Sequence, residues 1–431
     1  MYRKITDFLK VWKEGSHRKP LILQGARQVG KTYSILEFGR THYENVAYFN
    51  FETNPKLNKT FEENISPDYL VPILSHIAGQ TIVKEKTLIV FDEIQLCERA
   101  LTSLKYFCED APDYHIIVAG SLLGVAVNRA KFSFPVGKVD MKTLYPMDME
   151  EFLLAIGENV LVTQIKNCFK TNMPMPSALH DKALYLYRQY LVVGGMPECV
   201  SQFIQTKDYI LIRHIQDTIL ASYLNDMSKY NTLNEIKKTR LAYDNITVQL
   251  SKKNTRFQYK LIKKGGRASE FENAIEWLCL SGIVSQVYKV EQIKKPLENY
   301  RDIDAFKIYV SDLGLLCAKK DLAANDILYM VEELNDFKGG MVENYVNVQL
   351  SINGYNSYYW ESARGAEIDF VIQRDGKLIP IEVKAADNTK AKSLKVYMNT
   401  YNPTYAIKLS AKNFALEDNK KIVPLYAAFC I

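Results

Sequence analysis

Residues 25–32 combine glycines, a lysine and a hydroxyl side chain at fixed spacing, directly after a short apolar run. They read Gly-Ala-Arg-Gln-Val-Gly-Lys-Thr, which fits the pattern G-x-x-x-x-G-K-[ST] without a departure. The glycines let the backbone wrap tightly, so that successive N–H groups and a helix N-terminus point at phosphates. The lysine can then reach the β- and γ-phosphates, and the hydroxyl can ligate magnesium. The sequence therefore predicts a nucleoside triphosphate site whose binding residues are Gly25, Ala26, Arg27, Gln28, Val29, Gly30, Lys31, Thr32 and Tyr33.

Two acids, Asp92 and Glu93, end a later apolar run. Asp92 is expected to hold the magnesium ion together with Thr32, and Glu93 to orient and deprotonate the attacking water. Ser121 ends a further apolar run, where a serine either contacts the γ-phosphate or the water, or caps a helix. We therefore expect hydrolysis of the triphosphate, with Lys31, Glu93 and Ser121 as catalytic residues.

The elements that position these residues alternate between short apolar runs and helical stretches from residue 20 to residue 147. Strands that are apolar throughout and separated by helices are typical of a parallel sheet buried on both faces. Residues 1–15 predict an amphipathic helix, and residues 148–230 are helical apart from a Gly-Gly-Met-Pro turn at 194–197. The four predicted strands are residues 21–23, 46–51, 88–91 and 115–119.

Together, these features resemble the AAA-superfamily ATPases, in which an Asp-Glu pair, a polar residue ending the next strand and a helical lid recur. Several motifs resemble more closely a group of prokaryotic ATPases with a C-terminal "domain of unknown function 4143"; these motifs are residues 25–32, 91–95, 134–138, 190–197 and 224–230. The resemblance covers essentially the whole chain and implies ATP as the nucleotide. Ser121 departs from the Asn or Thr of many AAA proteins, and Lys138 stands where relatives often have arginine. Neither Lys138 nor Arg129 is assigned as an arginine finger.

A basic segment lies between residues 245 and 269, with seven basic residues and no acid. A helix and a strand follow it, and this order resembles a winged helix, as the family resemblance also implies. A basic stripe beside such a helix would supply contacts to DNA phosphates. The alternatives are a solvated basic face or a surface for an acidic partner protein. The predicted DNA contacts are Lys252, Lys253, Arg256, Lys263, Lys264 and Arg267.

An acidic constellation follows near the C-terminus, on two predicted strands joined by a hairpin turn at residues 374–377. Asp369 and Glu382 on adjacent strands can share a divalent metal ion, and Lys384 can stabilise the attacking hydroxide. This arrangement resembles the PD-(D/E)XK nuclease superfamily, and Glu343 matches an extra acid on the first helix of such folds. The alternatives are a solvated sheet face with paired charges, or a nuclease fold without activity.

The predicted fold class is α/β: an AAA-type P-loop core with a parallel sheet and a helical lid, then a winged-helix domain and a restriction-endonuclease-like α/β domain. The expected boundaries are 1–147, 148–230, 231–324 and 325–431, which suits the length of 431 residues. The net charge of +6 permits an acidic partner without requiring one. No cysteine pair has zinc or redox spacing, and no apolar run is long enough to span a membrane, so a cytoplasmic protein is expected.

Two functions are compatible with these features. The first is an ATP-driven, magnesium-dependent enzyme that acts on DNA through the winged helix and the nuclease-like domain. The second is an ATP-dependent switch or scaffold whose C-terminal domains bind a protein partner, or a further copy of the chain, without cutting DNA.

Overall fold

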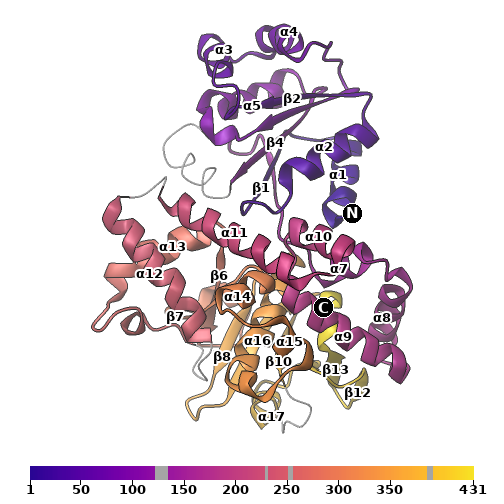
Figure 1. Cartoon of the computed structure of the whole chain (residues 1–431), viewed down its shortest axis with the longest axis vertical. Helices are drawn as coiled ribbons and strands as arrows, with labels where there is room; N and C mark the ends of the chain where they lie inside the picture. Colours follow the sequence, from indigo (N-terminus) through magenta and orange to yellow (C-terminus); the bar gives the residue numbers. More distant parts are fainter. Residues whose placement is uncertain (122–133, 229–231, 251–255, 386–391) are drawn as a thin grey trace. The chain divides into compact units, whose positions relative to one another are not determined.

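The computed structural model describes residues 1–121, 134–228, 232–250, 256–385 and 392–431 (Figure 1). The chain divides into two compact units. The N-terminal unit comprises Met1–Tyr145 with Leu280–Gly282, and the C-terminal unit comprises Pro146–Cys279 with Ile283–Ile431.

The N-terminal unit contains, among the described residues, a five-stranded parallel sheet with strand order β2-β3-β4-β1-β5. The four strands predicted from apolar runs are confirmed, and their side chains form the core; Leu88, Ile89, Val90 and Phe91 are fully buried. The sequence did not reveal β5, because its Asp-Met-Lys-Thr residues are only partly buried at the sheet edge. The strands are β1 (Leu21–Gly25), β2 (Asn45–Asn50), β3 (Thr87–Asp92), β4 (His115–Ser121) and β5 (Asp140–Thr143).

Helices cover this sheet and connect its strands. The predicted amphipathic first helix is confirmed, with Ile5, Leu9 and Trp12 buried. The helices are α1 (Lys4–Glu14), α2 (Lys31–His42), α3 (Leu57–Glu63), α4 (Pro67–Ala78), the single-turn η1 (Ile94–Leu96) and α5 (Glu98–Asp110). Because all strands are parallel, their carboxyl ends lie along one edge, where Gly25 neighbours Ser121 and Asn50 neighbours Asp92.

A helical region opens the C-terminal unit, as the sequence predicted. Its first helix begins with a capping box, in which Asp148 and Glu151 each accept the other's backbone N–H. The helices are α7 (Met149–Ala155), α8 (Asn159–Thr171), α9 (Ser177–Val193), α10 (Pro197–Thr206), α11 (Tyr209–Met227), α12 (Leu233–Leu250), η2 (Tyr259–Leu261) and α13 (Ala268–Leu280).

A mixed sheet, eight-stranded over the described residues, completes this unit with strand order β12-β13-β11-β10-β9-β8-β6-β7. The predicted hairpin is confirmed: β9 and β10 pair antiparallel around Asp375 and Gly376, which both have positive φ angles. Strand β6 pairs in parallel with β8, so the expected boundary at residue 324 divides strands that share one sheet. The strands are β6 (Val284–Val290), β7 (Arg301–Val310), β8 (Tyr358–Glu361), β9 (Glu367–Arg374), β10 (Lys377–Val383), β11 (Ala406–Ser410), β12 (Ala415–Glu417) and β13 (Lys420–Pro424).

The remaining helices are interleaved with these strands. They are η3 (Leu297–Tyr300), α14 (Leu313–Lys319), α15 (Ala324–Tyr329), η4 (Glu332–Leu334), α16 (Asn335–Ile352), α17 (Lys392–Tyr401) and η5 (Leu425–Cys430). In the described part of the chain, no helix is long and apolar enough to cross a membrane. The cysteines, all within the described ranges, are free thiols.

Candidate functional site

The phosphate loop (residues 25–32) runs from the end of β1 into the start of α2, as its motif requires. Gln28 and Gly30 have positive φ angles of 63° and 88°, which turn the backbone sharply before the helix. A Cβ atom on Gly25 would lie 2.3 Å from the Leu144 carbonyl oxygen, so this position has no room for a side chain. Tyr33, the last predicted nucleotide-binding residue, is exposed on the first turn of α2.

The Lys31 ammonium group is folded onto the phosphate loop. Its Nζ atom donates to the carbonyl oxygens of Gly25 at 3.0 Å and Ala26 at 2.7 Å. Burial lowers the pKa of Lys31 to about 8, although the carboxylates of Glu93 and Asp92 oppose this shift. A bound triphosphate would raise the pKa of Lys31 again, because its negative charge favours the ammonium form.

Asp92, at the carboxyl end of β3, collects hydrogen bonds from several elements. Its Oδ2 atom accepts from the Thr32 hydroxyl at 2.9 Å, the Tyr48 hydroxyl at 2.7 Å and the Asn50 amide at 3.4 Å. Its Oδ1 atom accepts from the Glu93 backbone N–H at 3.0 Å. The two predicted metal ligands, Thr32 and Asp92, are therefore in direct contact. Tyr48 and Asn50 were not predicted; the signal available was that polar side chains alternate with apolar ones in the run that became β2.

Glu93 and Ser121 lie at the same edge of the sheet. Glu93 has a left-handed backbone conformation with a φ angle of 54°, which is uncommon for residues other than glycine and often occurs at functional sites. Its carboxylate accepts a hydrogen bond from the Gln95 side chain. Ser121 ends β4 in register with Gly25 at the start of the phosphate loop.

Arg3 holds the phosphate loop through a hydrogen bond, and the sequence did not predict this role. Its buried guanidinium group donates to the carbonyl oxygen of Val29 at 3.0 Å and to that of Tyr145 at 2.7 Å. A residue so far from the motif in sequence carries no spacing signal, so only the fold reveals this contact.

Magnesium fits the Thr32–Asp92 pair. Mg²⁺ binds through hard oxygen ligands, using one or two protein groups together with substrate phosphates and water. A hydroxyl and a carboxylate in contact at the edge of the phosphate loop match this requirement. The described residues contain no group of three or more acidic, histidine or cysteine side chains that could hold a metal ion by themselves.

The basic side chains of this segment are exposed wherever the structure describes them. Arg256, Lys263, Lys264 and Arg267 are all exposed, whereas Lys252 and Lys253 lie outside the described residues. Lys263 forms a 3.7 Å ion pair with Glu270. Of the residues considered for an arginine finger, Arg129 lies outside the described residues, and Lys138 forms a 2.9 Å ion pair with Glu109.

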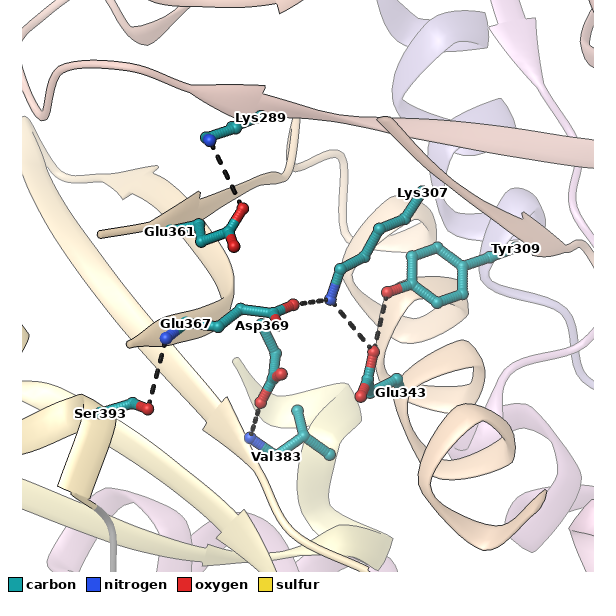
Figure 2. Close-up of polar contacts among 9 residues, drawn as sticks. All are labelled: Lys289, Lys307, Tyr309, Glu343, Glu361, Glu367, Asp369, Val383 and Ser393. Atoms are coloured by element: carbon teal, nitrogen blue, oxygen red, sulfur yellow. Dashed lines mark hydrogen bonds and ion pairs between the residues drawn. The ribbon is translucent and has the colours of Figure 1, made fainter. Parts of the chain in front are cut away.

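Two of the predicted nuclease-like residues, Glu343 and Asp369, lie beside an unpredicted lysine at one face of the mixed sheet (Figure 2). Lys307, on β7, is 1% exposed; its Nζ atom lies 3.4 Å from Glu343 Oε2 and 2.5 Å from Glu367 Oε1. The Tyr309 hydroxyl donates to the same Glu343 oxygen at 3.1 Å. Burial opposes the charge on Lys307, but Glu343 and the neighbouring anionic groups outweigh burial and raise the pKa of Lys307 well above its ordinary value.

The other acids of this face have separate partners. Asp369 Oδ2 accepts the Val383 backbone N–H at 2.7 Å, and Glu382 Oε1 lies 2.9 Å from Lys384 Nζ. Burial, reinforced by Glu343, raises the pKa of Asp369 to about 8. Because Asp369 and Glu382 are both buried, the alternative of a solvated sheet face does not hold for them.

The divalent metal ion of a PD-(D/E)XK nuclease does not fit this arrangement. Glu343 and Glu367 are directed at an ammonium group, and Asp369 is directed at a backbone N–H. In the described ranges, no three such side chains converge on a point where a cation could sit. We derive no cleavage step from these residues.

Family models match three successive segments of the sequence. Residues 17–153 match an AAA domain, residues 184–326 match the domain of unknown function DUF8612, and residues 338–428 match the domain of unknown function DUF4143. The chain contains an AAA domain and, towards its C-terminus, a DUF4143 domain. The resemblance inferred from the sequence motifs is thereby confirmed.

No functionally curated protein matches the sequence. The structure is similar to the Walker-type ATPase Paby2304 of Pyrococcus abyssi, with 13% identity and a TM-score of 0.45, covering 73% of this chain and 94% of that one. It is also similar to the Aeropyrum pernix Orc1 protein in complex with DNA (13% identity, TM-score 0.27, covering 74% and 91%) and to a Thermotoga maritima RuvB branch migration motor (13%, 0.28, covering 65% and 87%). At such TM-scores, the similarity carries no functional argument.

One cluster of site residues lies within a single family segment, and the other lies across two. The phosphate loop, Asp92, Glu93 and Ser121 all fall within the AAA domain. Lys307 falls within the DUF8612 segment, although the acids around it belong to the DUF4143 domain. The acid cluster is therefore built from two family segments that share one sheet.

Proposed function

We propose that the AAA domain hydrolyses ATP with Mg²⁺ at the carboxyl edge of its parallel sheet. The observation that carries the proposal is the 2.9 Å contact between Thr32 and Asp92, which joins the phosphate loop to the end of β3. This contact brings together a hydroxyl and a carboxylate, the two protein ligands that magnesium needs in a P-loop site.

Each predicted residue has a role that its position supports. The loop amides and the N-terminus of α2 would hold the phosphates, and Lys31 would exchange its two carbonyl partners for phosphate oxygens. Glu93 would accept the proton of the attacking water, and Ser121 would contact the γ-phosphate or that water. Bound magnesium would neutralise charge that develops on the phosphate oxygens.

Two variants test this proposal. Lys31→Ala should lose ATP affinity, because the phosphates lose their cation. Glu93→Gln should keep affinity but turn ATP over about 100-fold more slowly or worse, the usual contribution of a general base. Nucleotide binding by calorimetry and phosphate release would be measured for both variants and for Glu44→Gln, an acid whose side chain is 66% exposed, as a control. Normal turnover in Glu93→Gln would assign the base elsewhere.

We also propose that the C-terminal unit contacts the phosphate groups of DNA. The four segments predicted from the sequence would act as core, lid, DNA-contacting segment and C-terminal domain. The exposure of Arg256, Lys263, Lys264 and Arg267 supports this contact. Helix α13, which would be the recognition helix of a winged helix, exposes Glu272 and Glu276 and has no basic residue. Its charge favours contacts with the DNA backbone by the preceding segment over reading of bases by the helix.

The alternative is an ATP-dependent switch whose basic segment binds an acidic partner protein. DNA retention measured over a range of salt concentrations separates the two, because counterion release makes phosphate contacts strongly salt-dependent. Retention that falls steeply with salt supports DNA contact, and absence of retention at low salt favours the protein partner.

A further inference from the structure

Lys307 places an ammonium group among acids on one face of the mixed sheet. Among the described residues, no other basic side chain on this face is as deeply buried. It is 1% exposed and lies within ion-pair distance of both Glu343 and Glu367. Its ammonium also lies 5.1 Å from the centre of the Tyr359 ring, a distance at which cations are attracted to aromatic rings. Figure 2 shows the side chain reaching from β7 between Glu343 and Glu367, with Asp369 beside them.

We infer that Lys307 is the resident cation of this acid cluster, replacing the divalent metal ion that a PD-(D/E)XK nuclease would bind there. The DUF4143 domain is accordingly a structural or binding domain that does not cut DNA by a metal-dependent mechanism.

The electrostatics of a buried site supply the reason. Carboxylates taken out of water need a nearby positive charge, which a metal ion or a side-chain ammonium can provide. Strand β7 lies at the edge of the sheet, where it pairs with β6. The long side chain of Lys307 extends from β7 to Glu343 on α16 and Glu367 on β9. A metal ion beside Lys307 would be repelled by the Lys307 ammonium group, because that buried group cannot move away into water.

Glu382 is the acid on this face that is best placed to ligate a metal ion. Its Oε2 atom is buried and makes no hydrogen bond in the described part of the chain, while its Oε1 atom is paired with Lys384. If a metal ion did bind on this face, Glu382 and Asp369 would be its ligands. The decisive variants are therefore Glu382→Gln and Asp369→Asn.

The first experiment titrates Mn²⁺ into the full-length wild-type protein without nucleotide and follows the free ion by electron paramagnetic resonance. We expect no saturable site that depends on Asp369 or Glu382, and no Mn²⁺-dependent nicking of plasmid DNA. A saturable site lost in both Asp369→Asn and Glu382→Gln, or nicking lost in Asp369→Asn, overturns the inference. The outcome does not depend on ATP turnover, which the AAA domain performs with other residues.

The second experiment removes the resident cation. Lys307→Met should gain a saturable Mn²⁺ site, because the acids lose their counter-ion, and this gain should disappear in Lys307→Met with Glu343→Gln. Lys289→Met is the matched control, since Lys289 forms a 3.4 Å pair with Glu361 but its side chain is 25% exposed. A folded Lys307→Met protein without a new site contradicts the inference. If Lys307→Met does not fold, the wild-type titration decides alone.

Discussion

Replacement of Arg3 by alanine tests whether the phosphate loop depends on a residue outside its motif. The Arg3 guanidinium group donates to the carbonyl oxygens of Val29 and Tyr145 and is buried. A hydrogen bond with a charged partner contributes about 1.5–3 kcal/mol, and only the bond to Val29 ends on the phosphate loop, so its loss should destabilise the closed loop by roughly 1.5–3 kcal/mol. A difference of about 1.4 kcal/mol is tenfold in an equilibrium constant, so even the lower limit raises the open population of the loop by about 10-fold.

Hydrogen exchange of the full-length protein measures this directly. Amides of residues 25–33 should exchange at least about 10-fold faster in Arg3→Ala, while amides of the C-terminal unit keep their wild-type rates. The KM for ATP should rise because the loop must be ordered again on binding, and Arg3→Lys should lie between wild type and alanine because an ammonium lacks the guanidinium fork. Arg40→Ala, at an exposed position on α2, is the control. Wild-type exchange in the loop of Arg3→Ala would refute the argument that Arg3 holds it closed.

The remaining predictions concern other charges and contacts. Because burial lowers the pKa of Lys31 to about 8 and a triphosphate favours the ammonium form, ATP binding should take up protons above pH 8 and weaken as pH rises through that value; calorimetry in buffers of different ionisation enthalpy checks this, and buffer-independent heats at pH 9 would contradict it. Gly25→Ala should lower ATP affinity, because the new Cβ would lie 2.3 Å from a backbone oxygen and the loop must shift; an unchanged Kd by calorimetry would show that the loop tolerates the shift. Replacing Lys263, Lys264 and Arg267 by glutamine should weaken DNA retention and reduce its salt slope by up to about 0.9 per lost phosphate contact; filter binding measures this, and an unchanged slope would exclude these residues from the DNA contact.

The phosphate site illustrates how local spacing predicts chemistry. The motif residues of the phosphate loop are adjacent in sequence, and a strand followed by a helix is enough to place them. The Asp92-Glu93 pair was found for the same reason, since an apolar strand that ends in acids leaves them at the edge of a parallel sheet. Arg3 was missed because nothing in its local sequence indicates contact with the loop, whereas Tyr48 and Asn50 were missed although polar and apolar side chains alternate in that run.

The acid cluster of the C-terminal unit shows the opposite case. Its hairpin was predicted from Asp375 and Gly376, and that turn fixes the alternation of side chains on β9 and β10. Lys307 was assigned to a different domain, because the sequence could not reveal that β6 and β7 join the same sheet.

The sequence by itself therefore determined the phosphate-loop motif and the parallel sheet that presents it, because these depend on short-range spacing and on hydrophobic periodicity. Only the tertiary structure decided which charges meet: strand pairing across long stretches of sequence brings Lys307 to Glu343 and Glu367. Which distant strands pair depends on how whole sheets are buried, and no local sequence pattern indicates it.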